Sequence, residues 1–144
     1  MLARWAANCA AAVLPMFEQA AEDPRPRKAI EIGRAWALGK VRTGAAMKAS
    51  VAAHAAARSV QEPLAVAAAR AAGQAVATAH CADHCMGALL YVLKIRKLSG
   101  QGVEKEMKKQ ISKLPGKLQS MVQTGVGRRL GMMGQPLRKG SARR

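Results

Sequence analysis

The sequence contains few aromatic and few acidic residues. Its 144 residues include two Trp, one Tyr and one Phe, and eight Asp or Glu against 24 Lys or Arg. With so few aromatic rings, the basic residues lack the stacking platforms that single-strand nucleic-acid binders use. The few carboxylates form no obvious pair for acid–base chemistry, and there is no nucleophile elbow or phosphate-cradling glycine loop. We therefore expect a binding protein and not an enzyme.

Cysteine is also scarce. The three cysteines are Cys9, Cys81 and Cys85, and an odd count without framework spacing argues against a disulfide-stapled secreted domain. Reduced thiols and a cytoplasmic location are the simpler interpretation. No uncharged run approaches the roughly 18 residues that a membrane-spanning helix requires, so we expect no membrane partner.

Alanine, in contrast, is abundant. The sequence has 31 alanines, and 30 of them precede residue 89. Alanine is the best helix former and buries little surface, and no stretch shows the alternation of a strand. These features predict an all-α fold, a compact bundle or short array of five to six helices with alanine-rich packing.

Apolar spacing and breakers place the expected helices. The first covers the N-terminal segment with Trp5 on its apolar stripe, and others follow at about 26–38, 44–59, 63–80, from Asp83 onward, and 103–113. The third of these places Met47, Val51, His54 and Ala55 on one side. We divide the chain into a helical core (1–98), a short helical extension (99–122) and a basic, disordered tail (123–144).

Positive charge is concentrated after residue 93, where fourteen Lys or Arg accompany only two Asp or Glu. Such a segment attracts polyanions without specifying which. A basic nucleic-acid-associated protein is therefore an alternative function, and incidental affinity of a solvated tail is the plainer interpretation. The candidate polyanion-binding residues are Lys108, Lys109, Lys113, Arg128, Arg129, Arg138 and Lys139.

The local cluster most suggestive of a site lies at residues 80–85. If one helix ran through it, His80 and His84 would share a face at the spacing of helical zinc ligands, and Cys81 and Cys85 would form a second pair. Zinc is therefore a possible cofactor. Alternatively, Asp83 interrupts the helix, the histidines fix a junction between two helices, and the cysteines act as small hydrophobic residues.

Several short stretches together resemble a known family. They include Trp5–Ala10, Asp23–Arg27, Ala35-Trp36, Ala52–Arg58 and Ala69–His80, followed by His84, Gly87-Ala88 and Tyr91. This sequence resembles the putative immunity protein family, relatives of the immunity proteins of bacterial polymorphic toxin systems. The similarity covers about residues 3–95 and continues more loosely to about residue 120. Cys81 and Cys85 and the basic, glycine-rich tail depart from the family pattern.

The resemblance implies an all-helical cytosolic protein that binds a toxin and neutralises it. Under that interpretation, we expect recognition through a helical face or a groove near His54, His80 and His84, with Arg58 beside it. Arg25 and Arg27 form a second candidate edge for the partner, because they lie at the N-terminus of a helix, where anions are favoured.

Overall fold

The computed structural model describes residues 1–133 of the chain, and within this part it contains seven α-helices and no strand. The all-α prediction is confirmed, whereas the predicted five to six helices are too few. The helices are α1 (Leu2–Glu18), α2 (Arg25–Ala37), α3 (Thr43–Arg58), α4 (Pro63–Ala77), α5 (His84–Leu98), α6 (Val103–Ile111) and α7 (Gly116–Met133).

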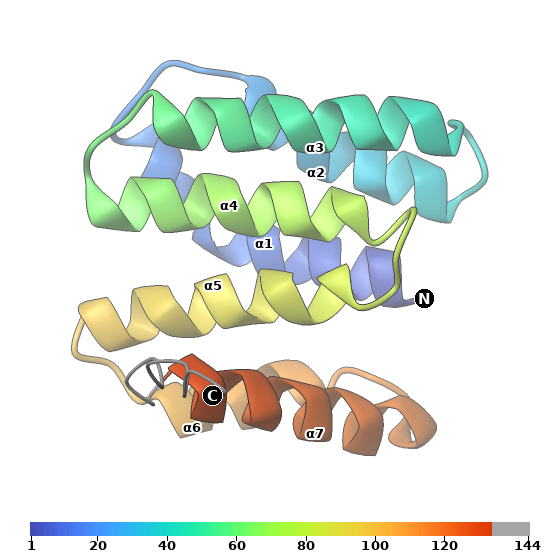
Figure 1. Cartoon of the computed structure of the whole chain (residues 1–144), viewed down its shortest axis with the longest axis vertical. Helices are drawn as coiled ribbons and strands as arrows, with labels where there is room; N and C mark the ends of the chain where they lie inside the picture. The colour runs from blue at the N-terminus through green and yellow to red at the C-terminus, as the bar shows by residue number, and fades with distance from the viewer. Residues whose placement is uncertain (134–144) are drawn as a thin grey trace, which may run out of the picture.

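Successive helices run in alternating directions and pack side by side (Figure 1). α3, α4 and α5 form the layer nearer the viewer in Figure 1, and α1 and α2 lie behind them. α6 and α7 form a further pair that packs against α5. The short connections favour this arrangement, because a short loop joins neighbouring helix ends and reverses the direction of the chain.

α4 is the helix that the others surround, since it packs against α1, α2, α3 and α5. Its buried residues include the consecutive Ala67, Ala68 and Ala69, which point in different directions around the helix axis. A single methyl group at each position lets neighbouring helices approach from several sides. The helix begins at Pro63, and the carboxylate of Glu62 accepts a hydrogen bond from the N–H of Ala65 (2.8 Å).

The side of α3 that carries Met47 and Val51 is not its buried side. Met47 and Val51 are 48% and 67% exposed, and the helix instead buries Ala46, Ala49, Ser50, Ala53, Ala56 and Ala57. Burial usually follows hydrophobic area, which would favour the larger apolar side chains. Close packing against α2 and α4 selects the small residues instead, and the two larger ones remain on the surface.

A buried polar chain fixes α6 to the rest of the bundle. The indole N–H of Trp5 in α1 donates to the carbonyl oxygen of Gln110 (2.8 Å), and the Gln110 side-chain amide donates to Glu106 Oε1 (2.6 Å). The other carboxylate oxygen of Glu106 lies 3.3 Å from Arg96 Nε in α5. The Trp5 and Gln110 donors are hydrogen-bonded in the interior, whereas Arg96 Nε is buried with only its ion pair to Glu106. These contacts give α6 a defined position against α1 and α5.

α7 corrects the predicted tail. Residues 123–133 were expected to be disordered, but the helix that begins at Gly116 continues to Met133. Val122 and Val126 are fully buried, and α7 packs mainly on α5 and α6. The glycines suggested disorder because they lower helix propensity, but packing of the two valines outweighs that preference. The remainder of the predicted tail, residues 134–144, lies outside the described residues.

Truncation of a buried residue in α5 should destabilise the bundle far more than truncation of an exposed one. Leu89 is fully buried, whereas Leu98 on the same helix is 52% exposed. We expect Leu89→Ala to lower the free energy of unfolding by ~2–5 kcal/mol, because it leaves a cavity. The matched variant Leu98→Ala should change it by less than about 0.5 kcal/mol. Urea unfolding measures both, and equal effects would contradict this assignment of the core.

Candidate partner-binding site

His54 and Arg70 form the first part of the candidate site. An Arg70 Nη1–H donates to Nδ1 of His54 (3.0 Å), which joins α3 to α4. The histidine ring lies so close to Gly73 that a Cβ at residue 73 would stand 2.6 Å from Nε2. Glycine at this position therefore makes room for the ring between the two helices.

His84, the first residue of α5, forms the second part. Its Nδ1–H donates to Oε1 of Gln74 in α4 (2.7 Å), because an amide oxygen can only accept. Gly87, one turn further along α5, leaves room for that amide, since a Cβ there would lie 2.6 Å from Gln74 Oε1. Gln74 thus orients His84 across the junction between α4 and α5.

These contacts hold the two neutral histidines in opposite tautomers, with the proton on Nε2 in His54 and on Nδ1 in His84. Burial lowers the pKa of His54 below its ordinary value of 6.5, and the charges of Arg70 and Arg58 lower it further. Burial also lowers the pKa of His84, with a smaller contribution from His80. Both rings are therefore neutral at pH 7 and act as directed hydrogen-bonding groups.

A pocket of about 450 Å³ lies beside His84, between α4, α5 and α7. Its walls include Gln74, His84, Gly87, Tyr91, Lys94 and Arg129. Arg129 is held in place by donating to the carbonyl oxygen of Gly125 (3.2 Å) and to the sulfur of Met86 (3.3 Å). The pocket therefore combines a fixed imidazole with two cationic side chains from different helices.

The outer side of α3 continues this surface. Met47, Val51, His54 and Arg58 follow each other at helical spacing, so they lie along one side of α3. Val51 and Met47 are largely exposed, and His54 at the edge of this row contacts α4. We call the combined surface of this row, Arg70, Gln74 and the pocket the α3–α4–α5 face.

The turn between α4 and α5 contains residues 80–83 and shows whether one helix runs through the cluster at 80–85. No single helix passes through it: α4 ends at Ala77 and α5 begins at His84. The rings of His80 and His84 are 5.0 Å apart between centroids, but Cys81 is exposed whereas Cys85 is buried. The two histidines therefore approach each other at a helix junction, and the two cysteines do not share a surface.

Metal binding gains no support from this geometry. Within residues 1–133, no group of three or more His, Cys, Asp or Glu side chains is arranged to hold a metal ion. Burial raises the pKa of the Cys85 thiol to about 11 and that of Cys9 to about 12, so both disfavour the thiolate that zinc prefers. Zinc binding by His80, His84, Cys81 and Cys85 stays a prediction that a zinc titration would decide.

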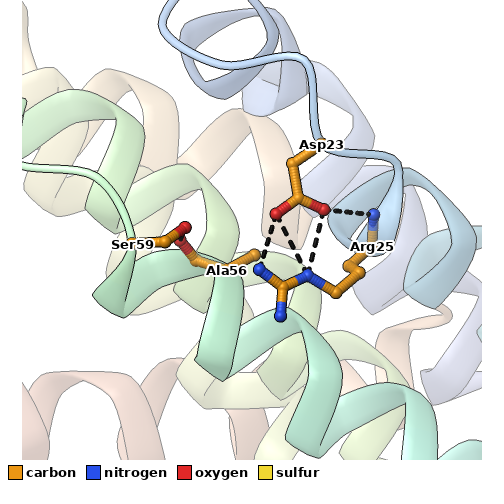
Figure 2. A network of polar contacts seen from close by, with 4 residues as sticks. All are labelled: Asp23, Arg25, Ala56 and Ser59. Atoms are coloured by element: carbon orange, nitrogen blue, oxygen red, sulfur yellow. Dashed lines mark hydrogen bonds and ion pairs between the residues drawn. The ribbon is translucent and has the colours of Figure 1, made fainter.

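Arg25 and Arg27 lie away from His80 and His84. The chain reverses at each loop, so α2 begins at the end of the bundle where α3 ends, opposite the turn between α4 and α5 (Figure 1). Figure 2 shows Arg25 bound by Asp23, with an Nη2 to Oδ2 distance of 2.7 Å, and Arg27 is paired with Glu18 at 2.6 Å. Each guanidinium group therefore has a carboxylate partner within the chain at the junction of α1 and α2.

The candidate polyanion-binding residues are dispersed. Lys108, Lys109 and Arg128 are exposed on α6 and α7, and Lys113 donates to the side-chain oxygen of Gln110 (3.1 Å). Arg129 is half-buried against Met86, as described above, and does not belong to a free tail. Arg138 and Lys139 lie outside the described residues. Polyanion binding by these side chains stays a prediction.

The sequence analysis did not identify Gln74, Tyr91 and Lys94 as members of one site. Gln74 carried the clearest signal, because it is the only polar side chain between Arg70 and Thr78 in a run of small and apolar residues. Tyr91 and Lys94 follow Gly87 at helical spacing, but nothing in the sequence indicated that α7 would complete a pocket with them.

Acidification should destabilise the fold through His54 and His84. Both folded pKa values lie below 6.5, so the unfolded chain takes up protons first as the pH falls. The stabilising contribution of the neutral rings is complete above pH 6.5 and is lost as the pH falls through the folded pKa values. Urea unfolding should show less stability at about pH 5.5 than at about pH 7.5, and His54→Gln should reduce that difference. NMR titration with either ring at or above its ordinary pKa would contradict this.

Replacing Gly87 by alanine should release His84 from Gln74. The new Cβ would displace the flexible Gln74 amide, so the hydrogen bond to Nδ1 is lost and the tautomer preference with it. Nitrogen-15 NMR of the His84 imidazole measures the tautomer preference. In the matched control Gly127→Ala, the new Cβ has no neighbouring atom within 4 Å. This variant should stabilise α7 by ~0.5–1 kcal/mol without altering the His84 signals. Unchanged His84 signals in Gly87→Ala would show that Gln74 does not control the ring.

Comparison with known proteins identifies the family but no individual relative. No curated protein and no solved structure matches the chain significantly. None of the helices within residues 1–133 combines the length and hydropathy needed to cross a membrane, and no comparison supports a nucleic-acid partner. A family model described as Imm-5 like putative immunity protein matches residues 1–117, which include all of α1 to α6. The chain belongs to this family.

Proposed function

We propose that this protein is an immunity protein that binds a toxin in the cytoplasm and neutralises it without catalysing a reaction. The observation that carries the proposal is the family match, which extends across the whole body of the bundle from α1 to α6. An immunity function requires a stable surface that recognises one protein, and the helical body offers such a surface in its α3–α4–α5 face.

Apolar exposure supports the use of this face. Val51 is 67% and Met47 is 48% exposed, so burying them under a partner removes apolar surface from water, which favours association. Side chains of this kind are suited to the apolar centre of an interface, with polar residues around them. His54 and Arg58 lie in the same row and provide directed polar contacts at its edge.

The charges on this face indicate the character of the toxin surface. Arg58, Arg70, Lys94 and Arg129 are basic, and Asp83 is the acidic side chain at the pocket. Complementary potentials speed association and select against wrong partners. The toxin is therefore expected to present an acidic surface around an apolar patch.

Coexpression with the toxin provides the test. The protein encoded next to this gene is expressed from an inducible promoter in a bacterial host, with and without the full chain. We expect the chain to restore growth and to form a stable complex with that protein. Val51→Asp, which places a charge in the apolar patch, should weaken the complex at least about tenfold, or ~1.4 kcal/mol, and should reduce protection.

Leu38→Asp is the matched control, because Leu38 is 64% exposed and directly follows α2, which lies in the layer behind α3, α4 and α5. It should leave both the affinity and the protection unchanged. Toxicity that the wild-type chain does not relieve would refute the proposed function. Protection that survives Val51→Asp at full affinity would place the binding surface elsewhere on the bundle.

A further inference from the structure

The pocket between α4, α5 and α7 is lined by more positively charged than negatively charged side chains. Lys94 and Arg129 supply two positive charges, and Asp83 supplies one negative charge. Arg129 Nη2 lies 3.8 Å from Asp83 Oδ2, and the Asp83 side chain is 72% exposed, so this ion pair is largely solvated. Lys94 forms no ion pair with any other residue of 1–133. The pocket therefore carries an excess of one positive charge.

The hydrogen-bonding groups of the pocket have fixed directions. Gln74 accepts from Nδ1–H of His84, so Nε2 of the neutral ring is an acceptor and the donors available to an anion are those of Arg129 and Lys94. Arg129 is anchored by the carbonyl oxygen of Gly125 and the sulfur of Met86. Groups held in place before a ligand arrives lose little conformational entropy on binding, which favours affinity.

The volume of the pocket and the apolar part of its wall restrict which kinds of ligand fit. A pocket of about 450 Å³ is much larger than a single ion requires, and Gly87 and Leu90 add apolar surface to it. A carboxylate on a short hydrocarbon chain matches this combination, because its charge faces the cations and its methylene groups contact the apolar wall. A metal cation is disfavoured by Lys94 and Arg129.

α7 supplies Arg129, and α7 lies almost entirely beyond the part of the chain that the family model matches, residues 1–117. The helix is nevertheless fixed on the bundle, since Val122 and Val126 are fully buried. Gly125 lies directly against the side chain of Met86 in α5. In this chain α7 therefore completes a pocket whose other walls come from the part that the family model matches.

We propose that this pocket binds a carboxylate group and that, in the immunity complex, the carboxylate belongs to an Asp or Glu side chain of the toxin. The second part rests on the proposed function, and the first part does not. Arg129 and Lys94 are the counter-charges of the carboxylate, and Arg129 makes its recognition specific to a chain that carries α7.

Acetate tests the first part without any toxin. The full-length chain is titrated with sodium acetate, with sodium chloride replaced so that the ionic strength stays constant, and the His84 imidazole signals are followed by NMR. We expect a saturable change that chloride does not produce. Lys94→Gln and Arg129→Gln should each weaken it at least about fivefold. A response equal to that in chloride, or equal in all variants, would overturn the carboxylate site.

Neighbouring cations supply matched controls. Arg128 precedes Arg129 on α7 and Lys97 follows Lys94 on α5, and both are exposed. Arg128→Gln and Lys97→Gln remove the same net charge and should leave the acetate response unchanged. Since Arg129 also contacts Met86, a thermal melt checks that Arg129→Gln keeps α7 in place. Lys94→Gln provides the same test at a residue that anchors no helix.

The toxin identified by coexpression tests the second part. Arg129→Gln should weaken the complex about tenfold, and the loss should shrink as salt is added, whereas Arg128→Gln should have no effect. If acetate binds but Lys94→Gln and Arg129→Gln leave toxin affinity unchanged, the pocket takes a free carboxylate and the second part is wrong. If acetate binds but the chain neither binds nor relieves any toxin, the proposed function fails and the carboxylate site stands.

Discussion

The enclosure of α4 by four other helices is the constraint on which the rest of the structure depends. A helix that is covered on most sides admits only small side chains, because larger ones would push its neighbours away. α4 meets this requirement with alanines and with Gly73. Its larger polar residues, Arg70 and Gln74, are confined to the partly exposed strip between α3 and α5. The histidines of the flanking helices reach α4 along this strip.

The same constraint explains where sequence reasoning succeeds for the fold. Helix formation is set by local propensity and by breakers such as Pro63, so the class and most helix positions could be predicted. The buried sides could not be predicted equally well, because alanine gives a weak signal of burial. Met47 and Val51 have the hydrophobicity of core residues, yet the alanines of α3 displace them to the surface. α7 was missed for the opposite reason, since its glycines outweighed the two valines that hold it.

The candidate site was predictable only in its histidines. His54 and His84 stand out as two of the three histidines in the sequence, and the structure brings both to α4. The grouping of His84 with Lys94 and Arg129 depends on how α7 packs, which spacing along the chain does not encode. For Arg25 and Arg27, the sequence suggested a site and the structure shows a pairing within the chain instead. Their position at a helix start suggested anion binding, but Asp23 and Glu18 supply the anions within the chain itself.

The attachment of α7 has a consequence for how such a protein can change over generations. The helix touches mainly α5 and α6, so a different terminal segment can replace it with little effect on the layers formed by α1 to α4. Each replacement would present a new side chain beside Lys94 while His84 and Gln74 stay where they are. Under the proposed function, changes in this one stretch of the gene would alter recognition while the layers of α1 to α4 stay intact, so we expect lineages that face different toxins to diverge there first.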